Sequence, residues 1–102
     1  MTAANPERGE VVLRLACGEE VVLRPSFEAL VAAEAEAGSL QTLLERAAAG
    51  DVRLADMAAL FWACHRDRTR DRCDFEAAIA AAGLAETVPA YRRLLMQVFA
   101  GA

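Results

Sequence analysis

The side chains with the most reactive chemistry are three cysteines and a single histidine, His65. Cysteine and histidine are common zinc ligands, and a zinc site needs three or four of them at characteristic spacings. His65 directly follows Cys64, and neighbouring residues of a helix point about 100° apart, so the pair is poorly placed to share one ion. No C-x-x-C pair is present, and an odd number of cysteines favours a reducing compartment. We expect structural roles, with a zinc or redox module built from Cys17, Cys64, Cys73 and His65 as an alternative.

Carboxylates do not combine into a recognisable catalytic motif. Glu34, Glu36 and Glu45 are not accompanied by a serine motif or a second polar cluster, and helix surfaces routinely carry glutamate. The chain contains no Walker, dinucleotide-binding, nucleophile-elbow or H-E-x-x-H motif. The sequence therefore predicts a protein that is not an enzyme, with no catalytic residues, no metal ligands and no cofactor.

The most polar stretch runs from Arg66 to Asp74, and its first seven residues alternate arginine with aspartate or threonine. Such a run is typical of a solvated loop in which the charges pair with each other. It could also be an arginine-rich docking surface for an acidic partner or a phosphate. The arginines of this alternative are Arg66, Arg68, Arg70 and Arg72.

Composition restricts the partner classes. The net charge of −4 disfavours a nucleic-acid binder, although all 11 basic residues are arginine. No apolar run is long enough to cross a membrane, and no signal peptide is recognisable, which favours a cytoplasmic protein. Hydrophobic residues form 56% of the chain, and 24 of its 102 residues are alanine. Alanine is the strongest helix former and adds little volume, so these counts predict closely packed helices in a single domain.

Two similar pentapeptides, residues 10–14 and 20–24, predict an N-terminal antiparallel β-hairpin over about residues 10–24. Alternation places Val11, Leu13 and Leu15 on one face of the first strand. Val21 and Leu23 form the matching face if Leu13 pairs with Leu23 and Leu15 with Val21. This register leaves a short loop centred on the glycine at position 18.

Helical signals fill the chain from about residue 26 to residue 100. Serine at positions 26 and 39, aspartate at 74 and threonine at 87 are placed to cap four helices, and glycine at 38, 50 and 83 to end three. A further helix extends from about residue 54 to 65. We therefore expect a mainly helical α+β fold, with the hairpin packed on four to five short helices. Each helix has one face that we expect to point inward. In chain order, the five faces are Phe27, Leu30, Val31 and Glu34; Leu40, Leu43, Leu44 and Ala47; Leu54, Met57, Leu60, Phe61 and Cys64; Phe75, Ala78, Ile79 and Ala82; and Tyr91, Leu94, Leu95 and Val98.

The order of these residues resembles the small tail proteins of gene transfer agents, which are phage-derived particles. The resemblance lies mainly in Arg8-Gly9-Glu10-Val11, Gly18-Glu19, the run from Leu23 to Leu30, and Gly38-Ser39-Leu40. It extends more weakly over about residues 8–100. This family is named both as a tail tube protein and as a tail assembly chaperone.

The resemblance implies a non-enzymatic protein of tail assembly that is cytoplasmic or associated with the particle. A chaperone of this kind binds the long, helical tape-measure protein or other tail proteins; a tube subunit would form a homo-oligomer. A single hairpin favours the chaperone, because a tube subunit normally needs a substantial sheet. A small DNA-binding regulator that uses the arginine run is a further alternative.

Partner recognition would place a helix in a cleft between short helices. Trp62 lies off the apolar stripe of its helix, so it either packs under the hairpin or is exposed at an interface. We expect exposed parts of the third and fifth helices to line the cleft through Trp62, Tyr91, Leu95 and Phe99.

Overall fold

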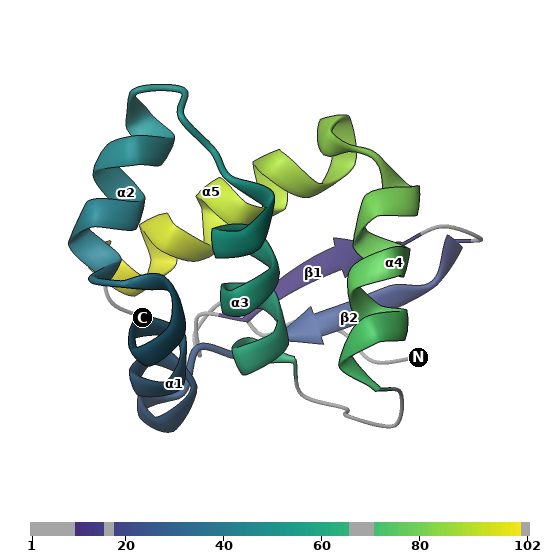
Figure 1. Ribbon diagram of the computed structural model, residues 1–102, viewed down its shortest axis with the longest axis horizontal. Helices are drawn as coiled ribbons and strands as arrows, with labels where there is room; N and C mark the ends of the chain where they lie inside the picture. The colour runs from purple at the N-terminus through teal and green to yellow at the C-terminus, as the bar shows by residue number, and fades with distance from the viewer. Residues whose placement is uncertain (1–9, 16–17, 66–70, 101–102) are drawn as a thin grey trace.

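The protein has an N-terminal β-hairpin followed by five helices in the computed structural model, which describes residues 10–15, 18–65 and 71–100. This is the mainly helical α+β fold that the sequence predicts. Helices α1 and α2 lie at one end of the molecule, and the hairpin runs from the middle toward the other end, where α4 is seen in front of its strands (Figure 1). The elements are β1 Val11–Arg14, β2 Glu20–Leu23, α1 Phe27–Ala37, α2 Leu40–Ala48, α3 Leu54–Cys64, α4 Arg72–Ala82 and α5 Leu84–Ala100.

The hairpin register is shifted by two residues from the predicted one. Leu13 lies opposite Val21, not opposite Leu23, which pairs with Val11. A two-residue shift keeps the same side chains on the core face, so hydrophobic alternation alone does not exclude it. The turn decides: the Leu15 N–H donates to the Glu19 carbonyl at 2.7 Å, which leaves residues 16–18 in the loop. Glycine 18 then holds the third loop position with φ of 77°, the left-handed conformation that a three-residue hairpin loop requires there.

Helices α1 and α2 begin at the predicted caps. The Ser26 hydroxyl accepts from the Ala29 N–H at 3.2 Å, and the Ser39 hydroxyl accepts from the Thr42 N–H at 3.0 Å. Each bond satisfies an N–H that has no partner within the helix. The stripe of α2 is also as predicted, since Leu43 and Ala47 are buried and Leu40 and Leu44 are half-buried.

The predicted stripe of α1 is wrong except at Leu30, which is half-buried against the core. Phe27 is 82% exposed and Val31 is 50% exposed, whereas Ala29 and Ala33 are buried. This helix packs mainly against α3. Two alanines on the contact face allow the helix axes to approach closely, which a stripe of Phe27 and Val31 would prevent.

The last two helices begin earlier than predicted. Asp71, not Asp74, caps α4, because its carboxylate accepts from the Asp74 N–H at 2.8 Å. The charged stretch is therefore helical from Arg72 onward, and residues 66–70 lie outside the described residues. In α5, Thr87 is an interior residue that is fully buried. Its hydroxyl donates to the carbonyl of the glycine at position 83, at 3.1 Å.

Apolar side chains from both strands and all five helices form one buried cluster. Both strands of the hairpin contact helices. The Arg24 N–H donates to the Cys64 carbonyl at 2.8 Å, and Leu23 bridges His65, so the end of α3 meets β2 at its last residue. Helix α5 packs along β1. None of the described helices is long and apolar enough to span a membrane.

Candidate partner-binding surface

Two of the four aromatic and apolar side chains predicted to line a cleft are in the core. Tyr91 is 2% exposed and Leu95 is fully buried. The Tyr91 ring packs edge-on against Phe61, with 6.0 Å between ring centroids. The expectation that these two residues are exposed is therefore wrong, because the face of α5 that carries them is the one that packs inward. Phe99, beyond them on α5, is 46% exposed.

Trp62 is half-buried and packs against α4. Its ring lies 5.5 Å from Phe75 and 6.0 Å from His65, and His65 in turn stacks on Phe75 at 4.6 Å. Three aromatic rings therefore join the end of α3 to α4. Cys64 and His65 are both buried, whereas Cys73 is exposed. Within the described residues, no group of three Cys, His, Asp or Glu side chains could hold a metal ion.

Only Arg72 of the arginine run lies within the described residues, so the run cannot be described as one surface. Arg66, Arg68 and Arg70 lie outside them. Arg72 is paired twice: it donates to Glu36 on α1, at 2.7 Å for one of two hydrogen bonds, and to Glu76 at 3.1 Å. The hydrogen bond from Arg72 lowers the pKa of Glu36. Arg72 therefore links α4 to α1 in this structure.

A hollow face along α5 was not anticipated from the sequence. One hollow, of about 220 Å³, lies between α2 and α5. It is lined almost entirely by apolar or small side chains, and its single charge is Arg92. The lining residues are Leu44, Ala47, Ala48, Arg92 and Met96.

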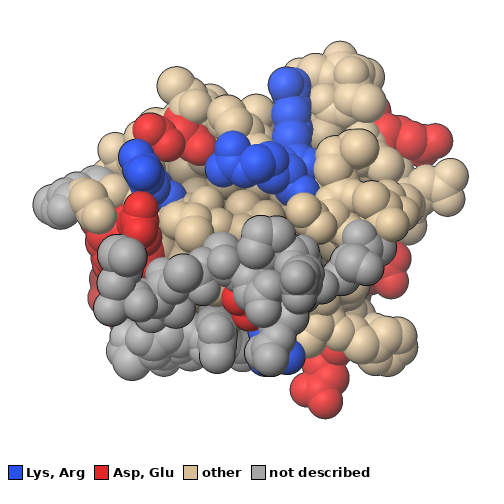
Figure 2. All heavy atoms as spheres, turned by 180° about the vertical axis from the view of Figure 1, so that it is seen from behind, with Lys and Arg blue, Asp and Glu red and all other residues tan. Residues whose placement is uncertain are grey.

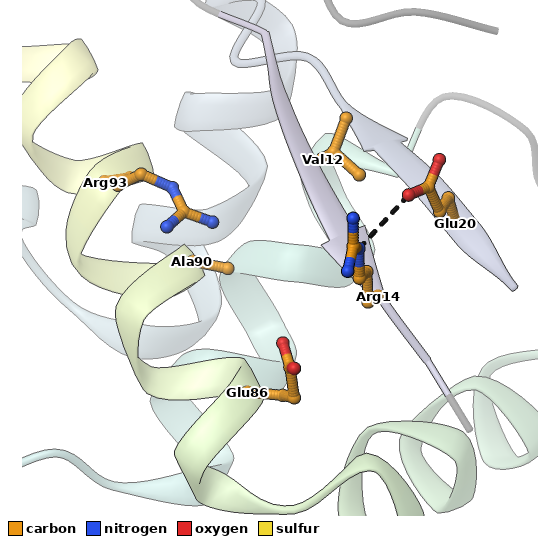
Figure 3. Close-up of a pocket in the computed structure, with 6 residues that line it drawn as sticks. All are labelled: Val12, Arg14, Glu20, Glu86, Ala90 and Arg93. Carbon is orange, nitrogen blue, oxygen red and sulfur yellow. Dashed lines mark hydrogen bonds and ion pairs between the residues drawn. The ribbon is translucent and has the colours of Figure 1, made fainter. Parts of the chain in front are cut away.

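A second hollow, of about 530 Å³, continues between α5 and β1 and shares Arg92 and Met96 with the first. A third, of about 360 Å³, follows toward the hairpin turn and shares Val12 and Arg93 with the second. Because neighbouring hollows share residues, we treat the three together as the α5 groove. In the third hollow, Arg93 and Glu86 extend from α5 toward β1, where Arg14 pairs with Glu20 at 3.2 Å (Figure 3).

Arginine side chains lie near the centre of the face seen from behind Figure 1, and most acidic side chains lie toward its edges (Figure 2). Arg92 and Arg93 are exposed, and no ion pair joins either of them to another described residue. Met96 beside them is 58% exposed. The α5 groove thus combines an apolar floor with two arginines available to a partner.

The sequence does contain a signal for this surface. Arg92, Met96 and Phe99 follow the 4 and 3 spacing of one helical face, adjacent to the buried stripe of Tyr91 and Leu95. Met96 and Phe99 therefore extend the apolar surface of the helix beyond what a single core contact needs. A second contact face is the simplest reason for that excess.

One protein-family model, described as phage tail tube protein, GTA-gp10, matches residues 8–101. No curated protein and no solved structure matches the chain. The matched range covers both strands and all five helices, and it agrees with the resemblance to tail proteins of gene transfer agents that the sequence indicates. This family serves phage tail structure and assembly and is not enzymatic. The chain belongs to the phage tail tube protein, GTA-gp10 family.

Proposed function

We propose that the protein is a tail assembly chaperone, which binds the tape-measure protein while the tail is built. The observation that carries this proposal is the small size of the sheet. Among the described residues it has two strands of four residues each. A tube wall joins subunits through extensive sheets, and an isolated hairpin is a weak basis for one.

The edges of the hairpin support the same proposal. Adding a strand from a neighbouring subunit requires an edge with unpaired backbone groups. On β2, the backbone at Arg24 and Leu23 is engaged by Cys64 and His65 at the end of α3. On β1, the neighbour is α5. A strand from another copy added to the hairpin would therefore meet α3 at the end of β2 and α5 along β1.

The α5 groove suits a helical partner better than an added strand. Tape-measure proteins are long and helical, and a helix binds a groove through apolar side chains spaced at one turn. The α5 groove, with exposed Met96 and Phe99 along one face of α5, has this character. Trp62 remains a second predicted contact, since this residue is only half-buried.

Co-expression with the proteins encoded beside this one, followed by affinity capture and mass spectrometry, tests the proposal. We expect the tape-measure protein to be the main partner and to remain soluble only when the chaperone is present. The alternative supported by the family description is a tube subunit. A stable homopolymer that does not capture the tape-measure protein would establish that alternative and refute the chaperone.

Single substitutions refine the test. Phe99→Ala and Trp62→Ala should each weaken capture, by about tenfold where the side chain is a central contact. Leu54→Ala is the matched control, because Leu54 is 52% exposed and lies outside the proposed surface. Circular dichroism must show that Trp62→Ala is folded, since Trp62 also packs on Phe75. Unchanged capture by both variants would contradict the proposed contacts.

A further inference from the structure

We propose that the α5 groove selects an acidic amphipathic helix, whose apolar face enters the hollow between α2 and α5 and whose carboxylates pair with Arg92 and Arg93. This inference rests on the proposed chaperone function and names the chemistry of the bound segment. It gives a role in partner selection to Arg92 and Arg93, which lie outside the core and form no ion pair with another described residue.

The apolar part of the site is built from small and flexible side chains. Ala47 is buried at its floor, Leu44 is half-buried, and Ala48 is exposed on the same side of α2. Small side chains leave room for a partner helix to approach closely, and Met96 can adapt to the shape of an incoming apolar residue. This hollow fits one or two apolar side chains of a helix better than a deeply enclosed ligand.

The charged part defines which helix fits. Arg92 lines the first and second hollows and Arg93 the second and third, so cationic groups occur at successive positions along the groove. A guanidinium donates in a planar fork that matches a carboxylate. Glu10, which also lines the second hollow, is only 5% exposed. The charged groups that a partner can pair with directly at this point are therefore the exposed Arg92 and Arg93.

The opposite end of the groove has mixed charge, because Arg14 and Arg93 line it together with Glu20 and Glu86. Glu86 extends into the third hollow, where the Arg14 guanidinium is already paired with Glu20 (Figure 3). A carboxylate of the partner would be repelled by Glu86 there. The bound helix should thus carry its acidic residues beside Arg92 and Arg93, and should be neutral or basic near Glu86.

A second copy of the chain is the competing occupant. Helix α1 exposes Phe27 and Val31 one turn apart, with Glu28 beside them, and so presents an acidic apolar face of its own. An α1 face docked in the α5 groove of another copy would produce a head-to-tail assembly. The experiment must separate this occupant from a tape-measure segment.

The test uses the full chain co-expressed with its tape-measure protein and compares capture by charge-reversed variants. Arg92→Glu combined with Arg93→Glu should reduce capture at least about tenfold, because close like charges replace attraction with repulsion. Arg24→Glu makes the same type of charge change at an exposed arginine outside the groove and should leave capture unchanged. Met96→Ala should also weaken capture, with Leu84→Ala on the same helix as its control. Replacing acidic residues of the bound segment with arginine should restore capture by the double variant.

Each outcome separates the inference from the proposed function. If the wild-type chain captures the tape-measure protein and the double variant captures it equally well, the acidic-helix site is wrong and the chaperone role stands. If the wild-type chain captures none, both are wrong. If the double variant and Phe27→Glu both convert a wild-type oligomer to a monomer in light scattering, the groove holds a second copy, which also overturns the inference.

Discussion

Two polar side chains of α5 lie within the core, and the structure accommodates them differently. The Thr87 hydroxyl donates to a backbone carbonyl one turn earlier, so its burial leaves the donor satisfied. Tyr91 contributes mainly its ring, which packs against Phe61. Burial of its hydroxyl, together with the negative charge of Asp56, raises the pKa of Tyr91 to about 12. The tyrosinate is therefore disfavoured in the folded protein.

This pKa predicts a loss of stability at high pH. An unfolded tyrosine ionises near pH 10, so stabilisation from neutral Tyr91 is complete below that value and is lost as pH rises through about 12. A rise in pKa of this size corresponds to about 2–3 kcal/mol in the free energy of unfolding. Because the chain has a single tyrosine, ultraviolet absorbance of tyrosinate reports this site alone. A midpoint near 10 in the folded protein, without unfolding, would contradict the buried environment.

At single positions, sequence reasoning succeeded where local chemistry decides the structure. Ser26 and Ser39 cap their helices as predicted, because a serine hydroxyl can satisfy an N–H three residues later without help from the rest of the fold. Phe27 and Val31 are exposed against expectation. Two apolar stripes fit the sequence of α1, and the choice between them depends on how closely α3 approaches, which the local sequence does not encode.

Between elements, the guanidinium of Arg72 links α4 to α1 in the described part of the chain. Arg72 donates to Glu36 across the two helices and to Glu76 within α4. Both Arg72 and its acidic partners are partly exposed, so solvent screens the interaction and limits its contribution. Its value is mainly to fix where the start of α4 lies relative to α1.

Acidification should weaken this connection. The pKa of Glu36 is lowered in the folded state by the hydrogen bond from Arg72, so its stabilisation is present above pH 4.5 and is lost as pH falls through the folded pKa. Arg72→Gln should cost less than about 1 kcal/mol at pH 7, and the difference from wild type should shrink by pH 3. Urea denaturation at both pH values measures the difference in the free energy of unfolding between the variant and the wild type. Arg53→Gln is the control, since Arg53 reaches Asp51 only at 3.7 Å. An equal difference at both pH values would show that Glu36 is not the acid-sensitive partner.

For the hairpin, the sequence predicted the strands and their core face but not the register. Alternation correctly placed Leu13 and Val21 on the core face, and it excluded any register shifted by a single residue. It did not separate two registers that differ by two residues, because both bury the same side chains. The backbone requirement of the turn made that choice, through a glycine with positive φ at the third loop position.

Across the whole molecule, the candidate surface was the least predictable feature. The α5 groove draws Leu44 from α2, Val12 from β1 and Arg92 from α5, which are distant in sequence. Their proximity follows from tertiary packing and not from any local pattern. The abundance of alanine was informative at this scale, since Ala47 and Ala48 line the groove and Ala29 and Ala33 face α3.

The shared apolar core predicts that folding needs neither metal nor disulfide. Both strands and all five helices contribute to one buried cluster, and a chain of 102 residues can bury enough surface to fold on that basis. Cys64, which is buried, and Cys73, which is exposed, are not joined by a disulfide in the structure. We expect one cooperative thermal transition whose midpoint is unchanged by EDTA or by a reducing agent.

A disulfide or a structural metal would change the melting temperature by an amount that this measurement detects easily. A structural disulfide typically contributes about 2–5 kcal/mol, and 1 kcal/mol shifts the melting temperature of a domain of this size by roughly 4–8 °C. Loss of a disulfide or of a structural metal would therefore lower the midpoint well beyond experimental error. A fall of that size in EDTA would support a zinc module that recruits Cys17, which lies outside the described residues. A fall in reducing agent alone would instead indicate a disulfide and argue against a reducing compartment.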